Sequence, residues 1–316
     1  MKSVKWKNFS ALLMVAFLLL LDGCGSGTDK VANPDGEVAY ANHEKLDGVP
    51  KALRDGVQQM SESNGIEFED TDAAGNANLQ LDQVNALIDK KPAALVLVAV
   101  NGDSIISAVE RANEAGIPVI ATNRDVNGGV FTNVINNERQ AGELQADYMA
   151  AHLPQNGKVV YVTGDTTIRV GVDRWEGFRD ELKAKRPDVE ILAHSPGTDW
   201  AFADGLKHMT LWLGLYPQID GVAAANDYMA LGAVAAMKNA GRFNQDIIVC
   251  GVDAGKNALD AIASGDMDMT VKQDVDKIIG TIFECIKEAR SGKMPEPGDR
   301  LVPMIGVTKD NLAQYR

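Results

Sequence analysis

The sequence predicts an α/β protein of two lobes, each built on a parallel β-sheet covered by helices. From Val38 onward, short apolar runs alternate with amphipathic stretches in roughly ten strand–helix units. The runs are continuously apolar, which is typical of strands buried on both faces of a parallel sheet. A chain of 316 residues with 45% hydrophobic residues is long enough for two lobes of roughly 100 to 150 residues each.

The elements can be assigned in chain order from this pattern. Apolar runs that predict strands are residues 38–42, 93–100, 117–122, 158–164, 219–226 and 247–253. Amphipathic stretches that predict helices are residues 49–65, 104–116, 138–153, 173–187 and 276–292. Glycines that follow helices, as a left-handed cap requires, are Gly116, Gly241, Gly265 and Gly292.

The first residues predict an exported lipoprotein. Lys2, Lys5 and Lys7 precede an apolar run that is too short to span a bilayer, so residues 1–23 are expected to be a signal peptide. The run ends in "LDGC", which resembles the bacterial lipoprotein signal, although Asp22 departs from it. We therefore expect a lipid anchor on Cys24; ordinary cleavage next to a chance cysteine is the alternative. Residues 24–36, rich in Gly, Ser, Asp and Pro, are expected to form a flexible tether.

Charge and motifs exclude several classes of function. The net charge of −13, without a cluster of Lys and Arg, argues against nucleic acid or an anionic membrane surface as a partner. No G-x-G-x-x-G follows a strand, no phosphate-binding G-x-x-x-x-G-K-[ST] occurs, and the four histidines have no metal-ligand spacing. We expect no enzymatic activity, no cofactor and no metal. Cys250 and Cys285 are expected to be buried free thiols; a disulfide between them, which an exported protein could form, is the alternative.

Polar side chains follow nearly every apolar run. They are Asn42-His43, Asn101, Asn123-Arg124, Asn136-Asn137, Asp165, Asn226-Asp227, Asp253 and Gln273-Asp274. In open parallel sheets, ligands bind outside the carboxyl ends of the strands. Helix caps explain single Asn or Asp residues, but they do not explain Arg124, Gln273 or the doubled pairs. Amides, carboxylates and guanidinium groups together match vicinal hydroxyls, so the sequence predicts a site for a sugar or polyol.

Five motifs carry a resemblance to a known family. They are "GIPVIATNRD", "DRWEGF", "GVAAANDYMALGA", "VCGVDAG" and "TVKQD". In their order and spacing, the chain from about Glu37 onward resembles the exported sugar-binding proteins of ABC transporters, in the ribose and galactose branch. The resemblance implies the type I periplasmic binding protein fold, with two doubly wound lobes joined by three crossings. It places residues 37–136 with 274–302 in one lobe and 137–273 with 303–316 in the other.

The resemblance also implies a set of site residues. Its ligand-facing positions fall on Asn123, Arg124, Arg174, Asn226, Asp253 and Gln273. Asp227 would then cap the following helix, and Trp200 stands where the family has an aromatic ring that can stack on a sugar.

Two positions depart from the family pattern. In "LDGVP" we expect Asp47 to replace the family's polar contact, and the aromatic ring beside it is missing. Glu138 adds a carboxylate at a ligand-facing position, unless it is simply a first-turn acid favoured by the helix dipole. Both departures weaken any transfer of ribose or galactose as the ligand.

The function implied is that of an extracytoplasmic solute-binding protein. The two lobes would close on a small sugar or polyol, and a monomer anchored at the periplasmic or cell surface would deliver it to an ABC permease. The alternative is a ligand sensor that presents the closed form to a membrane receptor or sensor kinase. A sugar-responsive repressor shares the fold, but it would need a helix-turn-helix where this chain has a secretion signal.

Overall fold

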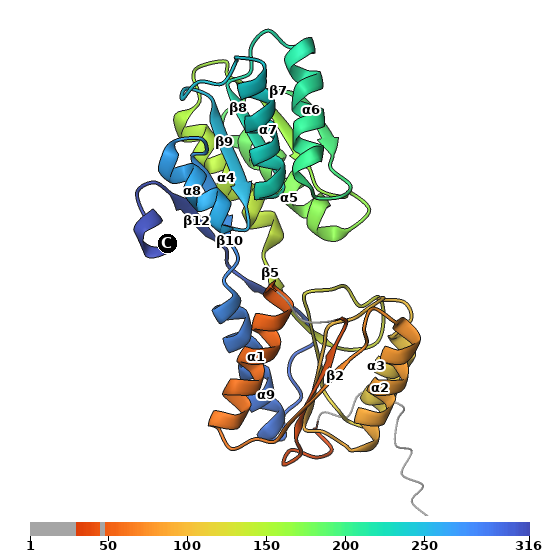
Figure 1. Cartoon of the computed structure of the whole chain (residues 1–316). Helices are drawn as coiled ribbons and strands as arrows, with labels where there is room; N and C mark the ends of the chain where they lie inside the picture. Colours follow the sequence, from red (N-terminus) through yellow and green to blue (C-terminus); the bar gives the residue numbers. More distant parts are fainter. Residues whose placement is uncertain (1–29, 45–47) are drawn as a thin grey trace, which may run out of the picture.

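The computed structural model describes residues 30–44 and 48–316, which form two lobes stacked one above the other (Figure 1). The first lobe contains a six-stranded sheet in the order β11-β5-β4-β3-β1-β2, and all its pairings are parallel. Its strands are β1 (Val38–Asn42), β2 (Phe68–Asp72), β3 (Ala94–Leu97), β4 (Val119–Thr122), β5 (Thr132–Asn136) and β11 (Gly298–Val302).

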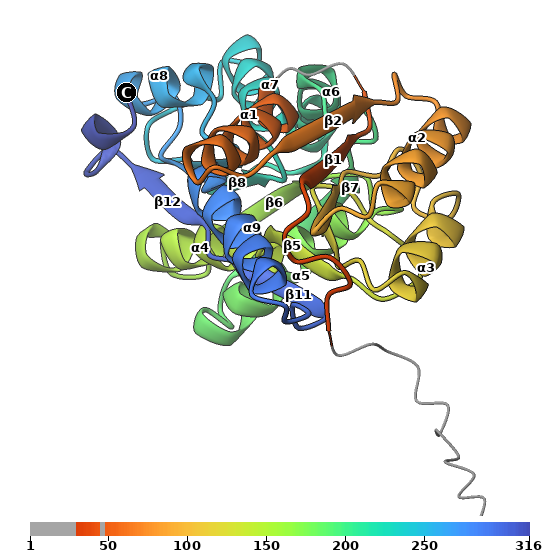
Figure 2. The ribbon, with the colours of Figure 1, turned by 90° about the horizontal axis from the view of Figure 1, so that it is seen from below.

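Helices cover both faces of the first sheet, as Figures 1 and 2 show. On one face α1 (Gly48–Ser63) lies beside α9 (Val275–Arg290), and on the other lie α2 (Ala77–Asp89) and α3 (Ile106–Glu114). Each face has its own apolar core. The inner strands are therefore buried on both sides, which explains why their sequences are continuously apolar rather than alternating.

The second lobe repeats this architecture. Its sheet has the order β12-β10-β9-β8-β6-β7 and is parallel except for β12, which runs antiparallel to β10. Its strands are β6 (Lys158–Thr163), β7 (Glu190–Pro196), β8 (Gly221–Ala224), β9 (Ile248–Val252), β10 (Met269–Lys272) and β12 (Ile305–Thr308). Its helices are α4 (Glu138–His152), α5 (Arg169–Lys185), α6 (Phe202–Leu215), α7 (Asp227–Asn239), α8 (Lys256–Ser264) and the short η1 (Leu312–Gln314).

The chain passes between the sheets three times: from β5 to α4, from β10 to α9, and from β11 to β12. Hydrogen bonds tie these crossings together. Asn136 Nδ2 donates to Gln273 Oε1 at 3.0 Å, and the backbone N–H of Asn137 donates to the carbonyl of Val302 at 2.9 Å. The predicted fold class, two doubly wound parallel-sheet lobes joined by three crossings, is confirmed.

Local features of the sequence account for the ends of several helices. Gly116, Gly241, Gly265 and Gly292 all have φ between 65° and 84°, a conformation that residues with a Cβ rarely adopt, so they end their helices as predicted. Helix α5 begins at Arg169, four residues before the amphipathic stretch that predicted it.

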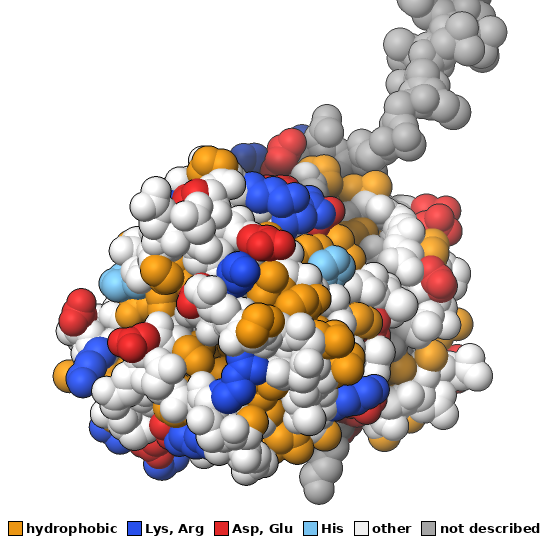
Figure 3. Space-filling model, turned by 90° about the horizontal axis from the view of Figure 1, so that it is seen from above, with side chains coloured by type: hydrophobic (Ala, Val, Ile, Leu, Met, Phe, Trp, Pro, Cys, Tyr) orange, Lys and Arg blue, Asp and Glu red, His pale blue; other side chains and the backbone are white. Residues whose placement is uncertain are grey.

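Three smaller features of the described residues concern the cysteines, the surface and the helix lengths. Cys250 and Cys285 are both free and buried, in agreement with the sequence analysis. On the outer face of the second lobe, seen in Figure 3, basic and acidic side chains are interspersed among hydrophobic ones. Among the described residues, no helix is both long enough and apolar enough to cross a bilayer.

The expected tether needs a correction at its second half. Residues 30–36 pack against the first lobe: Val31 is buried in the core beneath α9, and the backbone N–H of Ala32 donates to the carbonyl of Gly116. Asn33 Nδ2 also donates to the carbonyl of Lys91 at 2.7 Å. The sequence did not predict this contact, because the Gly, Ser, Asp and Pro residues of the stretch are typical of a flexible tether. The predicted signal peptide, Cys24 and residues 24–29 lie outside the described residues.

Candidate functional site

A cavity of about 160 Å³ lies between the lobes, where the carboxyl ends of their strands face each other. Asn123 and Arg124, which follow β4, line it from the first lobe, and the start of helices α4 and α5 lines it from the second. Asn136 and Gln273 line it from the crossings. Part of the wall of the first lobe is aliphatic and consists of Val49, Leu53 and Ile278.

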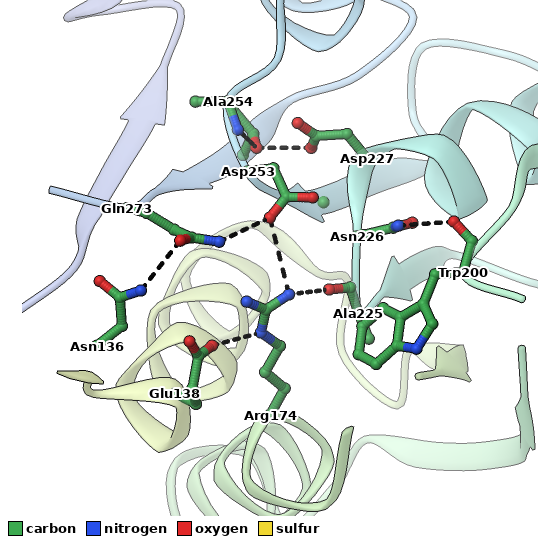
Figure 4. Close-up of polar contacts among 12 residues, drawn as sticks. Asn136, Glu138, Arg174, Trp200, Ala225, Asn226, Asp227, Asp253, Ala254 and Gln273 are labelled. Carbon is green, nitrogen blue, oxygen red and sulfur yellow. Dashed lines mark hydrogen bonds and ion pairs between the residues drawn. The ribbon is translucent and has the colours of Figure 1, made fainter. Parts of the chain in front are cut away.

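Arg174 is the centre of the second lobe's wall (Figure 4). It projects from α5, is only 3% exposed, and donates from Nε to Glu138 Oε2 at 2.6 Å and from Nη1 to the carbonyl of Ala225 at 2.6 Å. Asp253 Oδ1 lies 3.9 Å from the same Nη1. Although burial lowers the pKa of Arg174, the carboxylates of Glu138 and Asp253 raise it by more. Arg174 is thus a fixed cation whose position is set by three segments of the lobe.

Trp200 and Asn226 form a second part of this wall. The guanidinium carbon of Arg174 lies 5.9 Å from the centroid of the Trp200 ring, and the ring packs so closely on Gly164 that a Cβ there would lie 2.0 Å from it. Trp200 has a φ of 54°, and Asn226 Nδ2 donates to its carbonyl at 2.8 Å. Asn226 therefore contributes to holding the unusual backbone that presents the ring.

The expectation that Asp227 caps helix α7 is wrong, whereas the expected ligand contact of Asn226 stays a prediction. Asn226 is the N-cap of α7, because its Oδ1 accepts from the backbone N–H of Met229 at 2.9 Å. Asp227 is the first helical residue, and its side chain turns inward instead of capping the helix. Both oxygens accept hydrogen bonds, from Thr270 Oγ1 at 2.6 Å and from the backbone N–H of Gly255 at 3.0 Å. Burial raises the pKa of Asp227 to about 8.

A chain of hydrogen bonds connects Asp253 to the crossings. Gln273 Nε2 donates to Asp253 Oδ1 at 3.2 Å, and Gln273 Oε1 accepts from Asn136 Nδ2 (Figure 4). Desolvation raises the pKa of Asp253, whereas the charge of Arg174 and the bond from Gln273 lower it. Asp253 is therefore connected, through Gln273 and Asn136, to two of the three crossings between the lobes.

The first lobe presents a more open group of side chains. Asn123 has a φ of 65°, and Arg124 is exposed with its Nη2 3.7 Å from Glu44 Oε1. Glu44 also lies 3.0 Å from Nε2 of His43, the buried residue that follows β1. Burial, with a contribution from the charge of Arg124, lowers the pKa of His43. Arg124 is therefore held less firmly than Arg174.

The structure gathers most of the predicted site residues around one space. Asn123, Arg124, Glu138, Arg174 and Gln273 line the cavity. Asp253, Trp200 and Asn226 connect to it through the contacts of Arg174 and Trp200. Their roles in binding stay predictions. Asp47 lies outside the described residues.

Other residues at the cavity were not identified from the sequence. Arg169 and Asp173 line it from α5 and are paired at 3.1 Å, while Asp125 follows Arg124 in the first lobe. Arg169 was missed because the predicted helix began after it. Asn136 was noted only as a strand end at the hinge. No local signal points to Thr270, which lies within β10 and touches Asp227 from 43 positions away.

The chemistry of the cavity suits an uncharged ligand rich in hydroxyl groups. Its lining carries three cations, Arg124, Arg169 and Arg174, against three carboxylates, Asp125, Glu138 and Asp173. Amide groups and guanidinium donors match hydroxyls that both donate and accept. In the part of the chain that the structure describes, no cluster of three His, Cys, Asp or Glu side chains could hold a metal ion.

Comparisons with known proteins support this interpretation. The model of the periplasmic binding protein domain matches residues 38–294. A xylitol-binding protein of Mycolicibacterium smegmatis is 30% identical over 297 residues, which cover 92% of this chain and 82% of the relative. A D-apiose import binding protein of Actinobacillus succinogenes is 28% identical over 265 residues, 83% of this chain and 84% of the relative.

Solved structures give the same result. An ABC transporter solute-binding protein of Bacillus halodurans with bound myo-inositol superposes with a TM-score of 0.72 at 28% identity, covering 89% of this chain and 97% of that one. A periplasmic ribose ABC transporter protein of Conexibacter woesei shares the fold, with a TM-score of 0.81 at 21% identity over 92% and 96% of the two chains. The relatives are binding proteins, which confirms that the chain is not an enzyme. The chain therefore belongs to the family of periplasmic binding proteins, which includes the solute-binding proteins of sugar ABC transporters.

Proposed function

We propose that the protein binds a small, uncharged sugar or polyol between its lobes and delivers it to an ABC permease. The observation that carries the proposal is the cavity between the strand ends, where hydrogen-bonding side chains from both lobes face one space and the lining charges balance. Relatives that bind xylitol and D-apiose, and the similar structure with bound myo-inositol, support this class of ligand.

The proposed mechanism is closure of the lobes around the ligand. From the second lobe Arg174, Glu138, Asp253, Asn226 and Trp200 would bind it, and from the first lobe Asn123 and Arg124, with Asp47 as a further contact. Arg174 Nη2 has no hydrogen-bond partner among the described residues, which supports its role as a donor to a ligand hydroxyl. Gln273 would contact the ligand from the hinge. Because a bridging ligand contacts both lobes only when they are closed, it shifts the equilibrium toward the closed form.

The remaining parts of the proposal concern the whole chain. We propose that residues 37–136 with 274–302 move as one lobe and residues 137–273 with 303–316 as the other. The sequence of the first 24 residues supports export and a lipid anchor on Cys24, which would hold the protein on the outer side of a membrane. We propose that it acts there as a monomer. The anchor is tested by mass spectrometry of the native protein, in which an unmodified Cys24 would contradict it.

Calorimetry on the mature protein tests the ligand class. The panel contains xylitol, D-apiose, ribose and myo-inositol, with glucuronate as an anionic control. We expect at least one neutral member to bind and glucuronate not to bind, because the three cations that line the cavity are balanced by three carboxylates. Asp253→Ala should weaken binding about tenfold or more, since a hydrogen bond to a charged group contributes roughly 1.5–3 kcal/mol. Binding of glucuronate alone, or of no member, would contradict the proposal.

A further inference from the structure

The backbone at Asp253, whose carboxylate lies beside the cavity-lining Arg174, is strained. Asp253 has a φ of 114° and the next residue, Ala254, a φ of 54°, so two successive residues with side chains adopt conformations that favour glycine. Such backbone persists only where its surroundings hold it in place. Contacts with neighbouring residues must therefore hold this turn after β9.

Three hydrogen bonds connect the turn to one buried carboxyl group. The backbone N–H of Gly255 donates to Asp227 Oδ2 at 3.0 Å, and the backbone N–H of Ala254 donates to Thr270 Oγ1 at 3.1 Å. Thr270 Oγ1 in turn donates to Asp227 Oδ1 at 2.6 Å. Two consecutive amides of the strained turn thus end, directly or through one hydroxyl, on the Asp227 carboxyl. Figure 4 shows the route from Ala254 to Asp227.

A glycine in the neighbouring strand leaves room for the carboxyl group of Asp227. A Cβ added to Gly251 in β9 would lie 2.3 Å from Asp227 Oδ1, so the strand has room for the carboxyl only because residue 251 is glycine. Asp227 is 5% exposed, neither it nor Asp253 lines the cavity between the lobes, and both line a separate pocket at the start of α8. Its contacts fit a support for the turn rather than a contact for the ligand.

We propose that Asp227, together with Thr270, is a positioning residue that fixes the turn at residues 253–255 and thereby the direction of the Asp253 carboxylate. The proposal extends the proposed sugar or polyol site. It assigns a function to the second polar residue of the Asn226-Asp227 pair, whereas the first caps the helix. In this turn Asp253 Oδ1 lies 3.9 Å from Arg174 Nη1 and 3.2 Å from Gln273 Nε2. A displaced turn would disturb both contacts.

If Asp227 only stabilised the fold, its removal would lower stability without a specific effect on the turn at residues 253–255. Removal of any buried carboxylate that accepts a backbone N–H lowers stability, whether or not it supports a ligand contact. Asp268, a half-buried carboxylate that also accepts a backbone N–H, offers a control in the same lobe. Its Oδ2 accepts from the backbone N–H of Val249 at 2.8 Å, near the amino end of β9, whereas Asp227 acts at the carboxyl end.

The first experiment needs no ligand. Amide hydrogen exchange is measured on the full mature protein and on Asp227→Ala, Thr270→Val and Asp268→Ala. We expect the amides of Ala254 and Gly255 to exchange about tenfold faster or more in the first two variants, and at the wild-type rate in Asp268→Ala. Thr270→Ser, which keeps the hydroxyl, should restore slow exchange at Ala254. Unchanged exchange at these amides in Asp227→Ala would overturn the proposal.

The second experiment measures binding by calorimetry with xylitol and myo-inositol as probes. Asp227→Ala and Thr270→Val should lose about tenfold in affinity, and Asp268→Ala should stay within about twofold at a comparable loss of stability. Asp227→Asn should recover most of the affinity, because its amide can accept from Gly255 and donate to Thr270. Equal losses in Asp227→Ala and Asp268→Ala would reduce the effect to stability and overturn the positioning role. If wild type binds neither probe, the proposed ligand class fails, whereas the exchange experiment still decides the role of Asp227.

Discussion

At the scale of single residues, Asn226 combines two contacts that can be separated by experiment. Its Oδ1 caps α7, and its Nδ2 holds the carbonyl of Trp200. We expect Asn226→Ala to lower the free energy of unfolding by about 1 kcal/mol, the usual loss for a cap, and also to weaken polyol binding several-fold because Trp200 loses its support. Chemical denaturation and calorimetry measure the two effects.

Asn76 provides the control for this variant. It caps α2 in the first lobe by accepting from the backbone N–H groups of Asn78 and Leu79, and it lies outside the cavity lining. Asn76→Ala should lose a similar amount of stability and bind as wild type does. If Asn226→Ala also binds as wild type does, Asn226 is a cap and nothing more.

The buried carboxyl of Asp227 predicts a pH dependence of stability. Its pKa is about 8 in the folded protein, against roughly 3.9 in an unfolded chain, because burial disfavours the charged form more than the bonds from Thr270 and Gly255 favour it. Nearby, Asp253 raises this pKa further and Arg174 lowers it. When Asp227 is ionised it accepts from Thr270 Oγ1; when it is protonated, its O–H can donate instead to the second lone pair of Thr270 Oγ1, since the first accepts from Ala254.

The direction in which the free energy of unfolding changes with pH follows from proton binding. Between about pH 4 and pH 8 the folded protein holds a proton that the unfolded chain releases, so the free energy of unfolding falls as pH rises, by up to about 1.4 kcal/mol per pH unit from this residue. Above pH 8 this contribution is constant. Asp227→Asn should remove it. Urea denaturation at pH 5, 6, 7 and 8 compares the two proteins, and equal slopes would show that Asp227 is ionised when folded.

At the scale of elements, the position of Arg174 depends on how closely α4 and α5 approach. A Cβ on Gly142 in α4 would lie 2.0 Å from the carbonyl oxygen of Arg174, and a Cβ on Gly177 in α5 would lie 2.0 Å from that of Arg139. The two glycines let the helix backbones touch. This contact places Glu138, at the start of α4, within hydrogen-bond distance of Arg174.

Gly142→Ala should therefore push the helices apart. We expect a loss of about 1–3 kcal/mol in the free energy of unfolding, as overpacking usually causes, together with weaker polyol binding as Arg174 shifts. Gly280→Ala is the control, because a Cβ there meets no atom within 4 Å in helix α9. It should raise stability by about 0.5–1 kcal/mol through helix propensity alone. A Gly142→Ala protein as stable as wild type would contradict the close approach.

Elements and strand ends were predictable because their signals are local. Continuous apolar runs, helix-ending glycines and polar residues after strands each need only a few neighbours in sequence, and they led to Asn123, Arg124 and Gln273. Roles that depend on distant partners were not predictable. The partner of Glu138 is 36 positions away, and Asn226 and Asp227 are equally good caps until the start of α7 is known to one residue.

At the scale of the whole molecule, each lobe is discontinuous in sequence but has its own core. One core cluster fills the second lobe, and two others lie on the faces of the first sheet. Trp175, Trp200 and Trp212 all lie in the second lobe, and Trp6 lies in the predicted signal peptide. Tryptophan emission of the mature protein therefore reports on the second lobe, while far-ultraviolet circular dichroism reports on both.

This asymmetry permits a test of how the lobes are coupled. Ile282 in α9 is fully buried in the first lobe, so Ile282→Ala should cost that lobe about 2–5 kcal/mol. Because the cores are separate, we expect its thermal transition by circular dichroism to move down, with a smaller shift in tryptophan emission. Leu182→Ala in the second lobe should shift both probes. A saturating polyol that bridges the lobes should bring the two transitions of Ile282→Ala together, because it stabilises only the form in which both lobes are folded. Equal shifts of both probes without polyol would instead mean that the three crossings already make the lobes unfold as one unit.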